Sequence, residues 1–244
     1  MKINMQQWAQ EIIDAKDVRN LPVLYFPVLK NMGISVPDSV NDPATIAKVM
    51  KEVLDKYPDT IAAIAGMDLT VDAQSFGVQV NFSEKQAPNI IDHILSGPED
   101  IEALQLPDIH SGRTDIFTKG CEEGQKLITD RPIFGGMLGP FSLAANLLDI
   151  NKCLKMTIKG KDNLHVLLDK CTTWLNDLFS KAGELFLPVS VFALYPETQD
   201  HNDYAADKAY CHQDHKILTG FSGIKVYGYE RKYALDQKSP KSDN

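Results

Sequence analysis

The sequence lacks a hydrophobic segment long enough to cross a membrane. Its longest uncharged run, Pro132–Leu148, contains glycines and prolines as well as polar side chains, and it falls short of the roughly 20 apolar residues that a spanning helix needs. The N-terminal residues 1–13 are interrupted by polar side chains and lack the apolar core of a signal peptide. We therefore expect a cytoplasmic protein that makes no membrane contact.

The sequence also lacks a basic excess and paired cysteines. Its 25 Lys and Arg face 33 Asp and Glu, which gives a net charge of -8, so a nucleic-acid partner is not favoured because too few cations remain for phosphates. The four cysteines contain no CxxC pair and are far apart, at positions 121, 153, 171 and 211. In a cytoplasmic protein this pattern predicts reduced thiols rather than a disulfide framework.

What the sequence does contain is an alternation of apolar runs and helical patterns. The chain has 244 residues, 43% of them hydrophobic, which is close to the roughly 250 residues of a (β/α)8 barrel. Unbroken apolar runs separated by helices indicate parallel βαβ units and an α/β fold. About four strands are predicted, half of a full barrel, at Leu21–Phe26, Ile61–Met67, Ile133–Leu138 and Leu185–Leu194.

The helices between these runs have recognisable ends. Asp42 followed by Pro43 predicts an N-cap and a first helical residue. A second clear helix is predicted from the cap Asp162 to Gly183.

The last quarter of the chain differs in composition from the rest. Residues 184–244 contain six of the eight tyrosines and three of the six histidines, and 199–216 show no convincing helical or strand period. We therefore divide the chain into residues 1–183 and an atypical C-terminal segment, 184–244.

Asp68 is the first candidate for chemistry, because it follows the buried run Ile61–Met67 directly. Reactive groups of parallel α/β folds gather at the carboxyl ends of strands, where a carboxylate can accept ligand N–H groups or a proton. The alternative is a cap for the next helix, with Asp72 as a solvated neighbour.

A second candidate is the turn formed by Gly139, Pro140, Phe141 and Ser142, which joins a strand to a helix. Such a turn lets a ligand approach the backbone closely. The alternative is that its glycine only permits tight packing of the strand against the helix.

A third candidate combines Cys211, His212 and His215, whose side chains could bind zinc. Their spacing fits no standard zinc finger, so a polar loop is the alternative. The sequence contains no GxSxG, HExxH or GxGxxG motif.

Four segments together resemble the uroporphyrinogen decarboxylase superfamily, and in particular its corrinoid-dependent methyltransferase branch. They are residues 21–34, 65–77, 111–120 and 130–149, with the motifs DLTVDA, GR before a helix, and GPFSLA. The resemblance implies a (β/α)8 barrel with N-terminal helices, of which this chain would hold an incomplete, N-terminal half. It also implies that Asp68 is the active-site aspartate and that Gly139–Ser142 line the same cleft.

The resemblance also bears on which reaction to expect. Decarboxylases of the superfamily carry an arginine-rich motif for substrate carboxylates, whereas the corresponding residues here, Tyr25–Met32, contain no arginine. We therefore expect a methyltransferase-like protein that moves a methyl group between a corrinoid protein and a small thiol. The alternatives are a uroporphyrinogen decarboxylase of porphyrin biosynthesis and a catalytically inactive, truncated fragment.

The methyltransferase branch implies zinc and a corrinoid as cofactors. Its zinc is held by a His-x-Cys pair and a later Cys, and we identify no such ligands here, because Cys211-His212 has the opposite order. The expected partner is a corrinoid protein or a tetrapyrrole substrate. Unpaired strand edges of half a barrel would also favour self-association.

Overall fold

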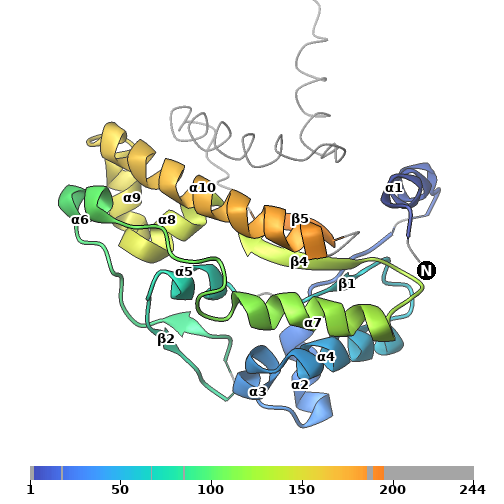
Figure 1. The fold of residues 1–244 in the computed structure, drawn as a ribbon. Helices are drawn as coiled ribbons and strands as arrows, with labels where there is room; N and C mark the ends of the chain where they lie inside the picture. The colour runs from blue at the N-terminus through green and yellow to red at the C-terminus, as the bar shows by residue number, and fades with distance from the viewer. Residues whose placement is uncertain (1–2, 18, 67, 85, 186–188, 195–244) are drawn as a thin grey trace, which may run out of the picture.

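A computed structural model describes residues 3–17, 19–66, 68–84, 86–185 and 189–194 of the chain (Figure 1). Its main sheet is parallel and has the strand order β1-β4-β5, with Ala63 paired to Ile133 and Ile133 paired to Val189. These strands are β1 (Ala63–Ile64), β4 (Ile133–Leu138) and β5 (Val189–Leu194). A small antiparallel pair is formed by β2 (Val80–Asn81) and β3 (Asn89–Ile90).

Helices connect the strands and cover the sheet. They are α1 (Met5–Asp14), α2 (Tyr25–Met32), α3 (Val36–Asn41), α4 (Pro43–Lys56), α5 (Val71–Ser75), α6 (Pro98–Ala103), α7 (Thr114–Leu127), α8 (Pro140–Leu148), α9 (Ile150–Met156) and α10 (Lys161–Leu185). Parallel strands joined through helices confirm the predicted α/β class, and β4 has the predicted bounds. Figure 1 shows α6, α8 and α9 at the end to which β4 points, whereas α1 lies at the opposite end.

The strand predicted at Leu21–Phe26 is wrong. Only Asn20, just before it, makes a parallel bridge, to Thr60, and Tyr25 already begins α2. Tyr25, Val28 and Leu29 are buried at helical spacing, and Pro27 is tolerated because it lies in the first turn. A short apolar run cannot by itself distinguish a buried strand from a buried helix.

The predicted ends of the last long helix are also wrong. Asp162 lies inside the first turn of α10 rather than before it, and α10 continues through Gly183 to Leu185. A glycine inside a helix costs only about 1 kcal/mol relative to alanine, so packing can override it. The boundary that we placed after residue 183 therefore falls within a helix.

Two hydrophobic clusters form the core, one reaching Leu138 at the end of β4 and the other reaching Ile133 at its start. One gathers around α8 and α10 and includes the fully buried Trp174. The other joins α4 and α7, and here glycine allows close approach: a Cβ on Gly120 would lie 2.7 Å from Cγ2 of Ile46. The clusters thus fix both helix layers against the strand whose carboxyl end carries the candidate turn.

The cap of α4 is as predicted, and it provides a first test of stability. The Asp42 carboxylate accepts the Thr45 backbone N–H at 2.9 Å and the Thr45 hydroxyl at 2.6 Å. Asp42→Ala should lower the free energy of unfolding by about 1 kcal/mol, because the first-turn N–H loses its acceptor. Urea denaturation measures this, with Asp42→Asn as the control that keeps an acceptor. Equal losses in both variants would contradict the capping role.

Candidate functional site

Asp68 lies at the carboxyl end of the β1 segment, as the sequence predicts. Pairing with β4 extends beyond β1, because the Ala65 N–H donates to the Phe134 carbonyl at 2.8 Å. The Asp68 Oδ1 atom then accepts the Thr70 backbone N–H at 2.9 Å and the Thr70 hydroxyl at 2.6 Å. Asp68 therefore orders the turn that leads from the strand into α5.

Arg113 pairs with Asp68 inside the protein. Its Nη1 donates to Asp68 Oδ2, its Nη2 donates to the Thr70 hydroxyl at 2.9 Å, and its Nε donates to Gln74 Oε1 at 2.6 Å. The guanidinium also lies 4.8 Å from the centre of the Phe82 ring. The side chain of Arg113 is 5% exposed and that of Asp68 is 0% exposed. The carboxylate is thus compensated and shielded from solvent.

This partnership was not predicted, although Arg113 lies in one of the family-like segments. The local signal is weak: a glycine-arginine pair immediately before a helix. Gly112 adopts φ +63, and its position would bring a Cβ to 3.2 Å from the Ser75 backbone nitrogen. Gly112 therefore lets the chain turn closely against α5, which places Arg113 beside Asp68.

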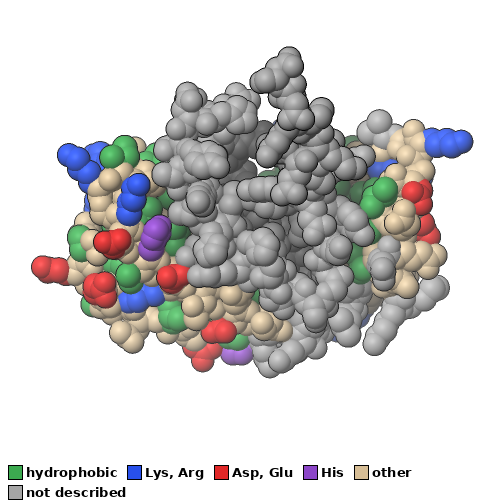
Figure 2. All heavy atoms as spheres, turned by 90° about the horizontal axis from the view of Figure 1, so that it is seen from above, with side chains coloured by type: hydrophobic (Ala, Val, Ile, Leu, Met, Phe, Trp, Pro, Cys, Tyr) green, Lys and Arg blue, Asp and Glu red, His purple; other side chains and the backbone are tan. Residues whose placement is uncertain are grey.

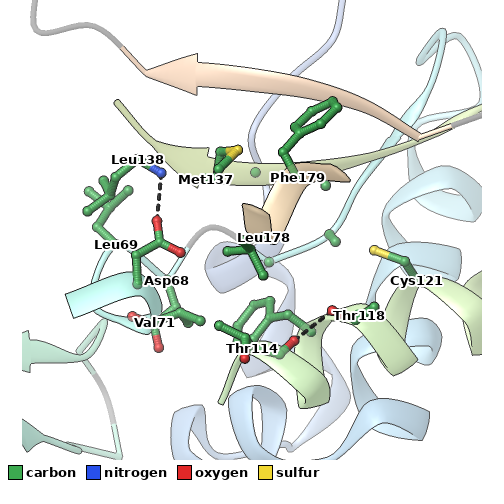
Figure 3. A pocket seen from close by; sticks show the side chains of 16 residues that line it. Asp68, Leu69, Val71, Thr114, Thr118, Cys121, Met137, Leu138, Leu178 and Phe179 are labelled. Carbon is green, nitrogen blue, oxygen red and sulfur yellow. Dashed lines mark hydrogen bonds between the residues drawn. The ribbon is translucent and has the colours of Figure 1, made fainter. Parts of the chain in front are cut away.

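Asp72 is the second carboxylate of the site, and it is not the solvated neighbour that the alternative interpretation of Asp68 described. It is buried, and its Oδ2 accepts the Leu138 backbone N–H at 2.7 Å; Figure 3 marks this bond by the dashed line at Leu138. Burial, with a smaller contribution from the negative charge of Asp68, raises the pKa of Asp72 to about 6. Asp72 thereby joins α5 to the last residue of β4.

A cavity of about 90 Å³ lies between these carboxylates and the helices α7 and α10 (Figure 3). Its wall is mostly apolar and consists of Ala65, Gly66, Asp68, Leu69, Val71, Asp72, Thr114, Phe117, Thr118, Cys121, Gly135, Gly136, Met137, Leu138, Leu178 and Phe179. Burial raises the pKa of Cys121 to about 12. That thiol therefore stays protonated near neutral pH and is not an activated nucleophile.

The turn Gly139–Ser142 comes directly after β4, whose last residue, Leu138, is also the last residue of this strand to line the cavity. Gly139 is the residue before α8 and Pro140 is its first residue, and both are buried. Phe141 and Ser142 are half-buried, and Phe141 packs against the core cluster of α8 and α10. The turn is thus held next to Asp72 through Leu138, and it borders the cavity rather than lining it.

A sequence model of the family described as Uroporphyrinogen decarboxylase (URO-D) matches residues 19–183. The chain belongs to the URO-D family. It is 30% identical over 117 residues to the Methylcobamide:CoM methyltransferase MtbA of Methanosarcina acetivorans, covering 47% of this chain and 34% of that protein. It is 27% identical over 145 residues to a uroporphyrinogen decarboxylase of Azotobacter vinelandii, covering 55% of this chain and 41% of that protein.

The fold of this URO-D family member is similar to that of a methyltransferase from Methanosarcina mazei. The two structures superpose with a TM-score of 0.72 at 19% identity, covering 88% of this chain and 66% of the other. The chain spans about a third to two fifths of the curated relatives that it matches.

The described residues of this URO-D family chain do not fit the zinc that the methyltransferase resemblance implies. Within the described ranges, no three His, Cys, Asp or Glu side chains gather so that they could hold a metal ion. Cys211, His212 and His215 lie outside the described residues. Among the residues that the structure describes, no helix is both long and apolar enough to cross a membrane.

Proposed function

We propose that this URO-D family member is a methyltransferase-like protein that moves a methyl group between a corrinoid protein and a small thiol. Similarity to two MtbA methyltransferases of Methanosarcina, 30% and 29% identical over 117 residues, supports the methyltransferase side of the family. The choice between methyl transfer and decarboxylation rests on whether the arginines of the described residues are free or already paired.

The chain has only four arginines, at positions 19, 113, 131 and 231, the last of which lies outside the described residues. The other three each pair with an aspartate of this chain: Arg19 with Asp17, Arg113 with Asp68, and Arg131 with Asp130. A porphyrinogen with eight carboxylates is held best by arginines whose guanidinium groups are free for bidentate contacts, which lysines cannot make. The described arginines are already paired, so the arrangement favours a substrate that is not polyanionic.

The proposed reaction needs an anionic sulfur at the moment of transfer. The thiol releases its proton to solvent, a carbon–sulfur bond forms, and the carbon–cobalt bond of the donor breaks with its electron pair left on cobalt. The Cys121 thiol does not take the acceptor role, because it is buried and protonated. In this proposal the acceptor is a separate small thiol.

Asp68 and the Gly139–Ser142 turn contribute by positioning in this proposal. The Asp68 carboxylate accepts three hydrogen bonds from Thr70 and Arg113, and its side chain has no exposed surface. It therefore fixes the loop after β1, while the Asp72 bond to Leu138 fixes the strand end that leads into the turn. Both supports hold the rim of the cleft in one geometry.

The test is demethylation of free methylcobalamin with 2-mercaptoethanesulfonate as acceptor, with and without added zinc. We expect loss of the methylcobalamin absorbance together with stoichiometric formation of the methyl thioether. Uroporphyrinogen is offered in a parallel reaction. Formation of coproporphyrinogen there, with no thioether in the first reaction, would establish the decarboxylase alternative instead.

A further inference from the structure

Exposed apolar side chains gather at the carboxyl end of the strands. Eleven large hydrophobic residues are exposed among those that the structure describes, and six belong to segments at this end. The most exposed of them, Ile158, is 75% accessible. Single exposed apolar residues are ordinary, but a gathering of them marks an interaction site. The six are Leu69, Ile91, Ile94, Ile150, Leu154 and Ile158.

Two hydrogen bonds and one close approach of a histidine to an aspartate link the three segments that carry these side chains. The Asn146 amide donates to the Leu69 carbonyl at 3.0 Å, and His93 Nδ1 lies 2.9 Å from the Asn146 carbonyl. His93 also lies 3.6 Å from Asp149, the residue that precedes α9. The loop around residue 93, the turn after Asp68 and the start of α9 are therefore neighbours.

Within this region, which also contains Asp92 and Asp149, residues 150–161 have a charge opposite to that of the whole protein. Residues 150–161 contain four lysines and no acidic residue, in a chain with a net charge of -8. Lys155, Lys159 and Lys161 are exposed and form no ion pair with a described residue. Figure 2 shows hydrophobic side chains beside Lys and Arg side chains at the upper left, at the end of the molecule where α9 lies.

Together, the six apolar side chains and the lysines of residues 150–161 form what we call the rim patch. Ile150 and Leu154 share one face of α9, four residues apart, and Ile158 follows in the turn after that helix. A partner that covers the patch must therefore present an apolar ridge with carboxylates beside it. An anionic bilayer is a poorer match, because the net negative charge of the protein opposes its approach.

We propose that the rim patch is the docking surface for an acidic, apolar-faced protein. If the proposed function holds, on which this assignment of the partner rests, that protein is the one that carries the methyl-corrinoid. The location supports it, because α9 follows α8, which begins at the carboxyl end of β4, and Asp68 follows the carboxyl end of the parallel strand β1. A donor protein docked there would be next to the cleft.

The test measures binding of a purified corrinoid protein loaded with methylcobalamin to the full chain by calorimetry. Two variants change the patch: Leu154→Gln/Ile158→Gln removes apolar surface, and Lys155→Glu/Lys159→Glu reverses charge. Matched controls change similarly exposed residues elsewhere: Ile13→Gln/Leu127→Gln and Lys48→Glu/Lys56→Glu. We expect each patch variant to bind the corrinoid protein at least about tenfold more weakly than the unchanged chain does. The control variants should bind it with unchanged affinity. Added salt should weaken binding of the unchanged chain.

Several results would overturn the proposal. Unchanged affinity in both patch variants, or no binding by the unchanged chain, would exclude this docking surface. The corrinoid protein could fail to bind while the unchanged chain binds phosphatidylserine–phosphatidylcholine vesicles and the patch variants do not; the patch would then be assigned to a membrane. If instead the unchanged chain self-associates and the patch variants do not, the patch would be assigned to a second copy of the chain. Demethylation of free methylcobalamin needs no docked protein, so its outcome tests the proposed function separately.

Discussion

Replacing Arg113 by methionine should lower the free energy of unfolding by about 3–5 kcal/mol, because the Asp68 carboxylate would lose its charged partner in a site without solvent. The side chains of the pair are 5% and 0% exposed, so water cannot replace the guanidinium without opening the structure. Methionine fills much of the same volume, so the loss reflects charge and hydrogen bonding more than packing. Guanidinium chloride denaturation, followed by the fluorescence of Trp8 and the buried Trp174, measures the change.

Two matched variants separate this effect from the general cost of losing an arginine. Arg19 pairs with Asp17 at the surface, with side chains 46% and 69% exposed, and Arg19→Met should change stability by less than about 1 kcal/mol. The double variant Asp68→Asn/Arg113→Met removes both charges and should recover much of the loss. If the double variant is as unstable as Arg113→Met, the ion pair is not the cause.

The elements of this fold that could be predicted are those with a strong local signal. Strand β4 has its predicted bounds because Ile133–Leu138 is apolar without interruption and ends at a glycine-proline turn. The start of α4 is as predicted because Asp42 and Pro43 each favour a helix start by their own chemistry. The placement of Asp68 followed from the strand before it, without knowledge of any partner.

The parts that could not be predicted depend on contacts between distant residues. Arg113 lies 45 positions after Asp68, and no local sequence pattern predicts that their side chains form a hydrogen bond. Asp72 is polar and follows a helix-start pattern, so sequence places it at the surface, yet it accepts a hydrogen bond from Leu138, 66 positions later. The candidate site therefore has one predictable residue and two partners that only the assembled fold supplies.

Asp72→Asn should change how stability depends on pH. The pKa of Asp72 rises from 3.8 in the unfolded chain to about 6 in the fold. A raised pKa means that protonation favours the folded state, so this contribution is fully present below about pH 4 and is lost as the pH rises through about 6. The loss amounts to about 3 kcal/mol, since each pKa unit corresponds to about 1.4 kcal/mol. Asparagine does not titrate, and its amide oxygen can still accept the Leu138 N–H.

The measurement is the free energy of unfolding of the unchanged chain and of Asp72→Asn between pH 4 and pH 8. The free energy of unfolding of Asp72→Asn, relative to that of the unchanged chain, should increase by about 3 kcal/mol as the pH rises. This change is expected whatever the difference between the two proteins is at pH 4. Asp130→Asn is the control: the hydrogen bond from the Arg131 side chain lowers the pKa of Asp130 below its ordinary 3.8, so its contribution is lost only as the pH falls below about 4. The difference for this variant should therefore stay nearly constant between pH 4 and pH 8. Parallel curves for the unchanged chain and Asp72→Asn would show that Asp72 is already ionised without cost at pH 4, and hence that the cavity beside it admits water.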